Sequence, residues 1–234
     1  MAPSFRPADR NFRDGNRFQL VRLVLFSPDR TTDFMESTVT PEAQDIDWMQ
    51  RVKRGDRDAF AELVEAHQGR VIGTVVRMLG PETMDAEDIS QQVFLRVWKS
   101  AARYEPTAKF TTWLFTITRN LVFNESRRRK NRPTSSLDAP GAGGDEDASP
   151  RQIADEATPS PEAALLEREM REAIDAAIAE LPEQQRMAVV LRRYEEMPYD
   201  EIARVLELTV PAVKSLLFRA RTFLRERLEK YLAQ

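Results

Sequence analysis

The chain of 234 residues contains no cysteine. It therefore has no disulfide bond, no thiolate metal site and no thiol redox switch of its own. Glycine is scarce, with 8 residues, which disfavours sandwich and barrel folds that depend on glycine-rich turns. The single histidine, His67, lies on the apolar side of an expected helix, and no Ser-His-Asp set, Gly-rich phosphate loop or metal-binding cluster is present. We therefore expect no catalytic residues, no metal and no cofactor.

Long hydrophobic runs are also missing. Residues 20–26 are the only candidate, but this stretch is far too short to span a bilayer and it contains Arg22. No small-residue cleavage site follows it, so it makes a poor signal peptide. We expect no membrane insertion and a cytoplasmic location.

The net charge of -3 is unevenly distributed along the chain. Residues 119–132 carry six basic side chains against one acid, whereas residues 138–162 carry seven acids against one arginine. A concentrated basic segment indicates nucleic-acid binding even when the whole chain is acidic. The acidic segment is interrupted by proline and glycine, which is typical of a flexible linker.

Helical periodicity and its interruptions predict an all-α fold of two small helical domains joined by this acidic linker. The clearest helices are expected near residues 45–54, 58–79, 85–101, 112–130, 162–179 and 199–206. We divide the chain into an N-terminal extension expected to be disordered, a first domain, a linker and a second domain, at residues 1–44, 45–132, 133–163 and 164–234.

The last fifty residues indicate a helix-turn-helix. A short helix over residues 199–206 is followed by a tight turn, and Thr209 is a suitable N-cap for the next helix. The apolar stripe of that helix consists of Val213, Leu217, Ala220, Leu224 and Leu228. Its opposite face carries Lys214, Ser215, Phe218, Thr222 and Arg225, with Arg221 at the edge. This face suits DNA phosphates and guanine edges; the alternative is a solvated amphipathic helix with Phe218 packed on a neighbour.

The segment 85–101 is predicted to be amphipathic with one exception on its polar side. Its core stripe is Ala86, Ile89, Ser90, Val93 and Val97, and its outward residues are Asp88, Gln91, Gln92 and Leu95. An apolar Leu95 among polar neighbours indicates a protein interface. The acids Asp85, Glu87 and Asp88 suit the helix dipole better than a metal ion, because no histidine or fourth acid joins them.

The stretch 104–132 mixes aromatic, threonine and basic residues. On the helix within it, Leu114, Ile117 and Leu121 are expected in the core, with Phe115, Thr118, Arg119 and Val122 on the other side. Aromatic rings beside cations suit unstacked single-stranded bases. An ordinary core with a solvated basic tail explains the same composition.

Together these segments resemble one family, the extracytoplasmic-function (ECF) sigma factors, which direct bacterial RNA polymerase to promoters. Three stretches carry the resemblance. They are DAEDISQQVFLRVW at 85–98, FTTWLF at 110–115 together with Ile117, Arg119 and Asn120, and the pair YDEIA at 199–203 and VKSLLFRAR at 213–221. The match covers roughly residues 45–132 and 165–232. Two features depart from the family pattern: Leu216 stands where arginine is frequent, and the N-terminal arm has no counterpart.

The resemblance implies a set of partners and contact residues. Core RNA polymerase, through the clamp helices of its largest subunit, is expected to bind Asp88, Gln91, Gln92 and Leu95. The minus-ten promoter element is expected to contact Tyr104, Lys109, Phe110, Thr111, Thr112, Trp113, Phe115, Arg119, Asn120 and Arg127, and to be melted there. The minus-thirty-five element is expected to contact Thr209, Lys214, Ser215, Phe218, Arg219, Arg221 and Arg225.

The resemblance also implies an anti-sigma protein as a further partner, and a role in a stress or envelope response. Two other classes remain open on the residues alone. A stand-alone helix-turn-helix regulator would explain residues 165–232 but not residues 88–132. A carboxylate-dependent nuclease would cleave DNA with a metal and without polymerase.

Overall fold

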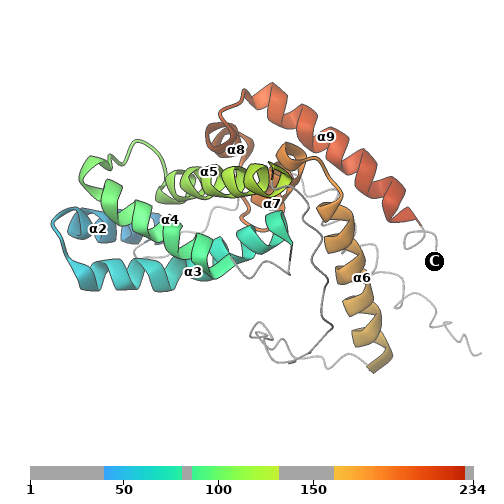
Figure 1. The fold of residues 1–234 in the computed structure, drawn as a ribbon, viewed down its shortest axis with the longest axis horizontal. Helices are drawn as coiled ribbons and strands as arrows, with labels where there is room; N and C mark the ends of the chain where they lie inside the picture. Colours follow the sequence, from blue (N-terminus) through green and yellow to red (C-terminus); the bar gives the residue numbers. More distant parts are fainter. Residues whose placement is uncertain (1–39, 81–85, 132–160, 230–234) are drawn as a thin grey trace, which may run out of the picture.

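The computed structural model describes residues 40–80, 86–131 and 161–229. These residues form helices and their connections, as predicted (Figure 1). The helices are α2 (Pro41–Lys53), α3 (Arg57–Leu79), α4 (Ala86–Ser100), the short 3-10 helix η1 (Ala101–Arg103), α5 (Phe110–Asn131), α6 (Pro161–Ala179), α7 (Glu183–Arg193), α8 (Tyr199–Leu206) and α9 (Val210–Arg227). None of the described helices is both long and apolar enough to cross a bilayer. Residues 1–39 of the predicted extension and most of the predicted linker lie outside the described residues.

Two helices begin earlier than their periodicity predicts. Helix α2 starts at Pro41 rather than Asp45, because the Thr40 side chain accepts a hydrogen bond from the Ala43 N–H at 3.3 Å. Proline suits the first turn of a helix, where its missing N–H is not needed. Helix α5 starts at Phe110, whose ring is 1% exposed, so burial of this side chain anchors the first turn.

The first domain consists of α2 to α5, with α3 packed against α2, α4 and α5. Its core is built on Met49, Leu63, Leu114 and Phe110, each at most 1% exposed. Burial of side chains of this size contributes roughly 1.5–3 kcal/mol each. His67 is 5% exposed, which confirms the prediction that it is buried.

The second domain consists of α6 to α9, and it contains the predicted helix-turn-helix. Helix α8 ends at Leu206, and its C-cap residue Glu207 adopts a left-handed conformation with φ of 57°. Thr209 then caps α9 by accepting a hydrogen bond from the Ala212 N–H at 3.4 Å. The predicted apolar stripe of α9 is confirmed, since all its members are at most 3% exposed, from Val213 to Leu228.

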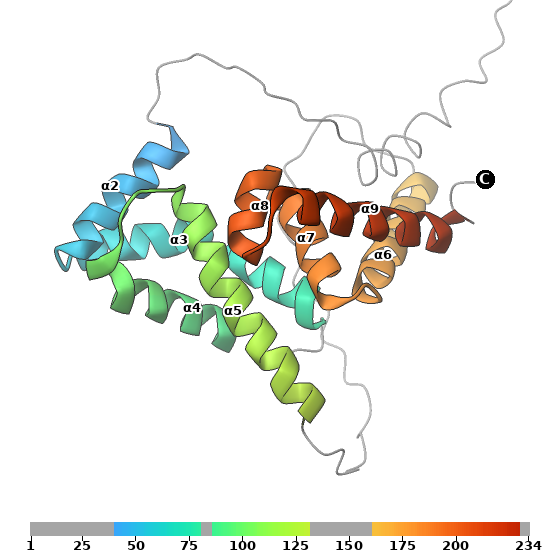
Figure 2. The ribbon, with the colours of Figure 1, turned by 90° about the horizontal axis from the view of Figure 1, so that it is seen from above.

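The two domains pack directly against each other, which the sequence did not predict. Figure 2 shows α5 lying between α4 on one side and α8 on the other, and α3 also contacts α7. One sequence expectation is therefore wrong: the side of α5 that was placed away from the core is buried. Phe115, Thr118 and Val122 are at most 1% exposed, because this helix has packing partners on two faces.

Candidate nucleic-acid and polymerase interfaces

The outer face of α9 is exposed and basic. Lys214, Ser215, Arg219 and Arg225 all point to solvent, and the Phe218 ring is 70% exposed. The alternative in which Phe218 packs on a neighbouring helix is therefore wrong. An exposed basic face on the second helix of a helix-turn-helix suits DNA contact.

Two residues near this face have structural roles. The Arg221 guanidinium donates to the Tyr199 hydroxyl at 3.0 Å, so it ties α9 to the start of α8. Arg192 lies over the same Tyr199 ring, 5.2 Å from its centroid. Leu216 is 7% exposed and belongs to the domain core, so this position offers no side chain to a phosphate. The Arg221–Tyr199 hydrogen bond is thus one of the contacts that hold α8 and α9 together.

The outward face of α4 matches its predicted pattern. The five expected core residues, from Ala86 to Val97, are at most 6% exposed. Asp88, Gln91 and Gln92 are exposed, and Leu95 is 55% exposed. An apolar side chain held in water on a rigid helix is suited to contact with another protein.

The segment from η1 into α5 is held by an aromatic cluster. The ring of Tyr104 lies 5.1 Å from that of Trp113 and 6.3 Å from that of Phe110, and the last two are 6.0 Å apart. Tyr104, Phe110 and Thr112 are buried, whereas Thr111 and Trp113 are half-buried. These buried side chains therefore hold the segment 104–113 in place. Their contact with an unstacked base of the minus-ten element stays a prediction.

Two predicted minus-ten contacts are engaged with the second domain. The Arg119 guanidinium donates to the carbonyl oxygen of Val205 at 3.0 Å and also pairs with Glu207. Lys109 pairs with Glu42 and, at 3.3 Å, with Glu201. The hydrogen bond to Glu42, together with the charge of Glu201, raises the pKa of Lys109 above its usual range. Of the other predicted contacts, Asn120 and Arg127 are exposed on α5.

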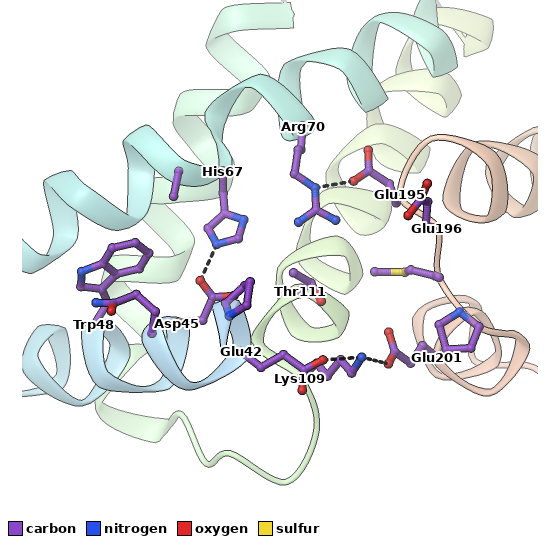
Figure 3. Close-up of a pocket in the computed structure, with 15 residues that line it drawn as sticks. Glu42, Asp45, Trp48, His67, Arg70, Lys109, Thr111, Glu195, Glu196 and Glu201 are labelled. Atoms are coloured by element: carbon purple, nitrogen blue, oxygen red, sulfur yellow. Dashed lines mark hydrogen bonds and ion pairs between the residues drawn. The ribbon is translucent and has the colours of Figure 1, made fainter. Parts of the chain in front are cut away.

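A cleft of about 420 Å³ lies between α2, α3 and the turn that joins α7 to α8 (Figure 3). Two pairs of polar side chains lie along it: His67 Nε2 lies 2.7 Å from Asp45 Oδ1, and Arg70 Nε donates to Glu195 at 2.7 Å. The Thr74 hydroxyl donates to the second oxygen of Glu195 at 3.2 Å. Sequence reasoning missed Asp45 and Glu195, because no local pattern marks an acid whose partner lies on another helix. Within the described part of the chain, no group of three metal-ligating side chains is close enough to hold an ion.

Comparison with known proteins places both domains in one family. Residues 63–132 match the family model "Sigma-70 region 2", and residues 171–224 match "Sigma-70, region 4". The ECF RNA polymerase sigma factor SigW of Bacillus subtilis is 34% identical over 180 residues, which cover 77% of this chain and 94% of SigW. The ECF RNA polymerase sigma-E factor of Escherichia coli K12 is 33% identical over 175 residues, covering 74% of this chain and 88% of that protein. The chain belongs to the ECF family of RNA polymerase sigma factors.

Solved structures share the fold. CnrH in complex with the cytosolic domain of CnrY superposes with a TM-score of 0.57 at 24% identity, covering 80% of this chain and 98% of that one. The sigma factor RpoE of Bartonella quintana, in complex with the anti-sigma factor NepR, superposes with a TM-score of 0.53 at 20% identity. The match covers 73% of this chain and 96% of that one. These likenesses support the two-domain helical architecture.

Membership in this family defines what the chain does. It binds core RNA polymerase and promoter DNA, and it directs promoter-specific initiation of transcription. Proteins of this family are specificity subunits rather than enzymes, so the nuclease alternative is wrong. A stand-alone helix-turn-helix regulator is also excluded, because the match to region 2 covers the first domain.

Proposed function

We propose that promoter recognition is divided among three surfaces of this chain. The α4 face (Asp88, Gln91, Gln92 and Leu95) binds core polymerase, and the α9 face (Thr209 to Arg225) recognises the minus-thirty-five element. The segment from Tyr104 to Arg127 binds and melts the minus-ten element. Residues 45–132 and 164–234 act as the two domains, and residues 133–163 connect them.

The observation that supports this division best is where the two exposed large apolar side chains of residues 40–80, 86–131 and 161–229 lie. Leu95 is 55% exposed on α4 and Phe218 is 70% exposed on α9, each within a polar surface. Exposed rings and leucines of this kind are covered when a partner binds. Leu95 lies one turn from the uncharged amides of Gln91 and Gln92, which suits a protein partner. Phe218 lies one turn from Lys214 and next to Arg219, which suit DNA.

Run-off transcription with purified core polymerase tests the proposal. The chain should direct transcripts from a cognate promoter, and core polymerase alone should not. Replacing the exposed Asn120 and Arg127 on α5 by Ala should preserve polymerase binding and reduce opening, seen as lost permanganate reactivity at minus-ten thymines. Open complexes that persist in this variant would remove the melting role from this segment.

We further propose that an anti-sigma protein masks this factor and that the factor acts in an envelope or stress response in the cytoplasm, where polymerase is. The support is the pair of uncovered apolar side chains, together with a structural neighbour that was solved with an anti-sigma factor. A bound masking protein should reduce core binding by mass action. Co-purification from the native host, followed by competition with core polymerase, would test this partner.

A further inference from the structure

The end of the first domain that lies far from α9 carries cations to which the proposed function gives no role. It is the junction where the turn between α2 and α3 meets η1. Residues 51–57 hold four basic side chains against one acid, and residues 96–104 hold three basic side chains and no acid. Figures 1 and 2 both show the α2–α3 turn beside the end of α4 and η1. A surface of this composition suits an anionic partner.

A hydrogen bond between two helices fixes the junction. Lys53 Nζ donates to the carbonyl oxygen of Tyr104 at 3.3 Å, so the last turn of α2 is tied to the residue that follows η1. The Tyr104 N–H donates to the Ala101 carbonyl oxygen at 3.0 Å and closes η1. Arg54 and Arg103 are the chain neighbours of the two bonded residues, so they lie on adjoining segments. We name Lys53, Arg54 and Arg103 the junction patch.

The junction patch is open to solvent, since all three of its members are exposed. The acid of the adjacent turn is already used: Asp56 pairs with Arg51 at 2.9 Å and caps α3 through two backbone N–H groups. Within residues 40–80, 86–131 and 161–229, no ion pair joins Arg54 or Arg103 to an acid. Glu105 is exposed next to the patch and leaves its charge positive. These cations are therefore available to phosphate groups.

The junction patch is continuous with the segment proposed to bind the minus-ten element. Arg103 directly precedes Tyr104, the first residue of that segment. The Tyr104 ring lies 5.1 Å from the ring of Trp113, which is half-buried and so partly accessible. Cations beside accessible aromatic rings are the combination that holds single-stranded nucleic acid, with phosphates on the cations and bases on the rings. The occupant that this surface suits is therefore a single strand of DNA.

The position of the patch decides which part of the promoter it can reach. Asn120 and Arg127, the exposed polar contacts proposed on α5, lie in the later part of that helix, and the segment 104–113 lies at its start. DNA followed along α5 from Arg127 past Asn120 arrives at Tyr104 and then at the junction patch. Because melting is proposed to occur at the segment 104–113, the strand that continues beyond it is unpaired.

We propose that the junction patch binds the backbone of the melted strand immediately downstream of the minus-ten element. Arg54 and Arg103 contact its phosphates, and Lys53 holds the two segments together beneath them. These contacts add affinity without sequence preference, because phosphates carry no base identity. Their role is to keep the strand on the protein and so to oppose re-pairing of the opened promoter. This inference rests on the proposed minus-ten role of residues 104–127.

The test compares two single-stranded oligonucleotides that bind polymerase assembled with this chain. The short one ends at the minus-ten element, and the long one continues downstream for about six nucleotides. Fluorescence anisotropy gives the Kd of each. In Arg54→Ala with Arg103→Ala, the Kd of the short oligonucleotide should be unchanged, and that of the long one should rise roughly three- to twentyfold. The slope of log affinity against log salt for the long oligonucleotide should become shallower by about 1.4, since two phosphate contacts are lost.

Three controls show whether charge on the patch is the cause. Arg54→Lys with Arg103→Lys keeps both charges and should retain most of the affinity. Arg168→Ala with Arg204→Ala removes two exposed arginines of the second domain and should change neither Kd. Methylphosphonate linkages in the downstream extension remove the charge of its phosphates, so wild type and the Ala variant should then bind it equally.

A cross-link identifies the partner directly. Because the chain has no cysteine, a photoreactive group attached at Arg103→Cys before assembly occupies a single position. In open complexes it should react with DNA just downstream of the minus-ten element. Reaction with polymerase subunits alone would make the patch a protein contact and would refute the inference.

The binding outcomes separate this inference from the proposed function. If wild type binds the short oligonucleotide, but the extension strengthens binding equally in wild type and the Ala variant, the junction patch has no part and the minus-ten role stands. If wild type does not bind the short oligonucleotide, the proposed minus-ten role is wrong and this inference falls with it.

Discussion

Replacement of Leu95 on α4 is the sharpest test of the polymerase-binding surface. The side chain is 55% exposed, so Leu95→Ala and Leu95→Asp should each lower the free energy of unfolding by only about 1 kcal/mol. Full burial of a leucine is worth roughly 1.5–3 kcal/mol, and about half of this remains to be gained when polymerase covers the exposed part. Leu95→Ala should therefore weaken core binding roughly three- to tenfold.

The aspartate variant should have a much larger effect. A carboxylate that is buried without a partner costs several kcal/mol, so the Kd for core polymerase should rise by a factor of about a hundred or more. Fluorescence titration of labelled factor with purified core polymerase gives the Kd, and thermal unfolding of the same samples reports the fold. Phe218→Asp, at the other strongly exposed apolar side chain, is the matched control and should leave core affinity intact. A Leu95→Asp protein that is folded and binds core as tightly as wild type would refute the assignment of the α4 face.

Three further substitutions test other parts of the structure. Lys214→Ala should weaken binding to a minus-thirty-five duplex by about 1–3 kcal/mol in mobility-shift titrations, with relaxed preference at one base pair if Lys214 contacts a base and uniform weakening if it contacts phosphate. Asp45→Ala should lower the free energy of unfolding by about 1–3 kcal/mol in urea, because it removes the partner of the buried His67 ring; an unchanged midpoint would mean that water replaces Asp45. Thr209→Ala should lower stability by about 1 kcal/mol through loss of the α9 cap, whereas Thr209→Ser should restore it in thermal melts.

The sequence by itself determined the helices and most of their faces. Helical periodicity predicted the buried apolar stripe of α9 and the outward position of Leu95 on α4. The structure agrees with both predictions, because each of these two helices has one buried side. The cap at Thr209 follows from local chemistry, since a threonine hydroxyl accepts a bond from an N–H three residues ahead. Such features depend on neighbours along the chain, which the sequence shows directly.

Only the tertiary structure decided what covers the second face of α5. Besides α3 and α4, α5 packs against α8, which lies more than 70 residues later in the chain. The partners of Arg119 and Arg70 are equally remote, 88 and 125 residues away. The helical period of a sequence identifies one buried side of a helix. It carries no information about a second helix that packs on another side, or about which acidic side chain pairs with which basic one. For this reason the residues proposed to contact the minus-ten element were predicted without partners in the chain, whereas Lys109 and Arg119 are paired with side chains of the second domain.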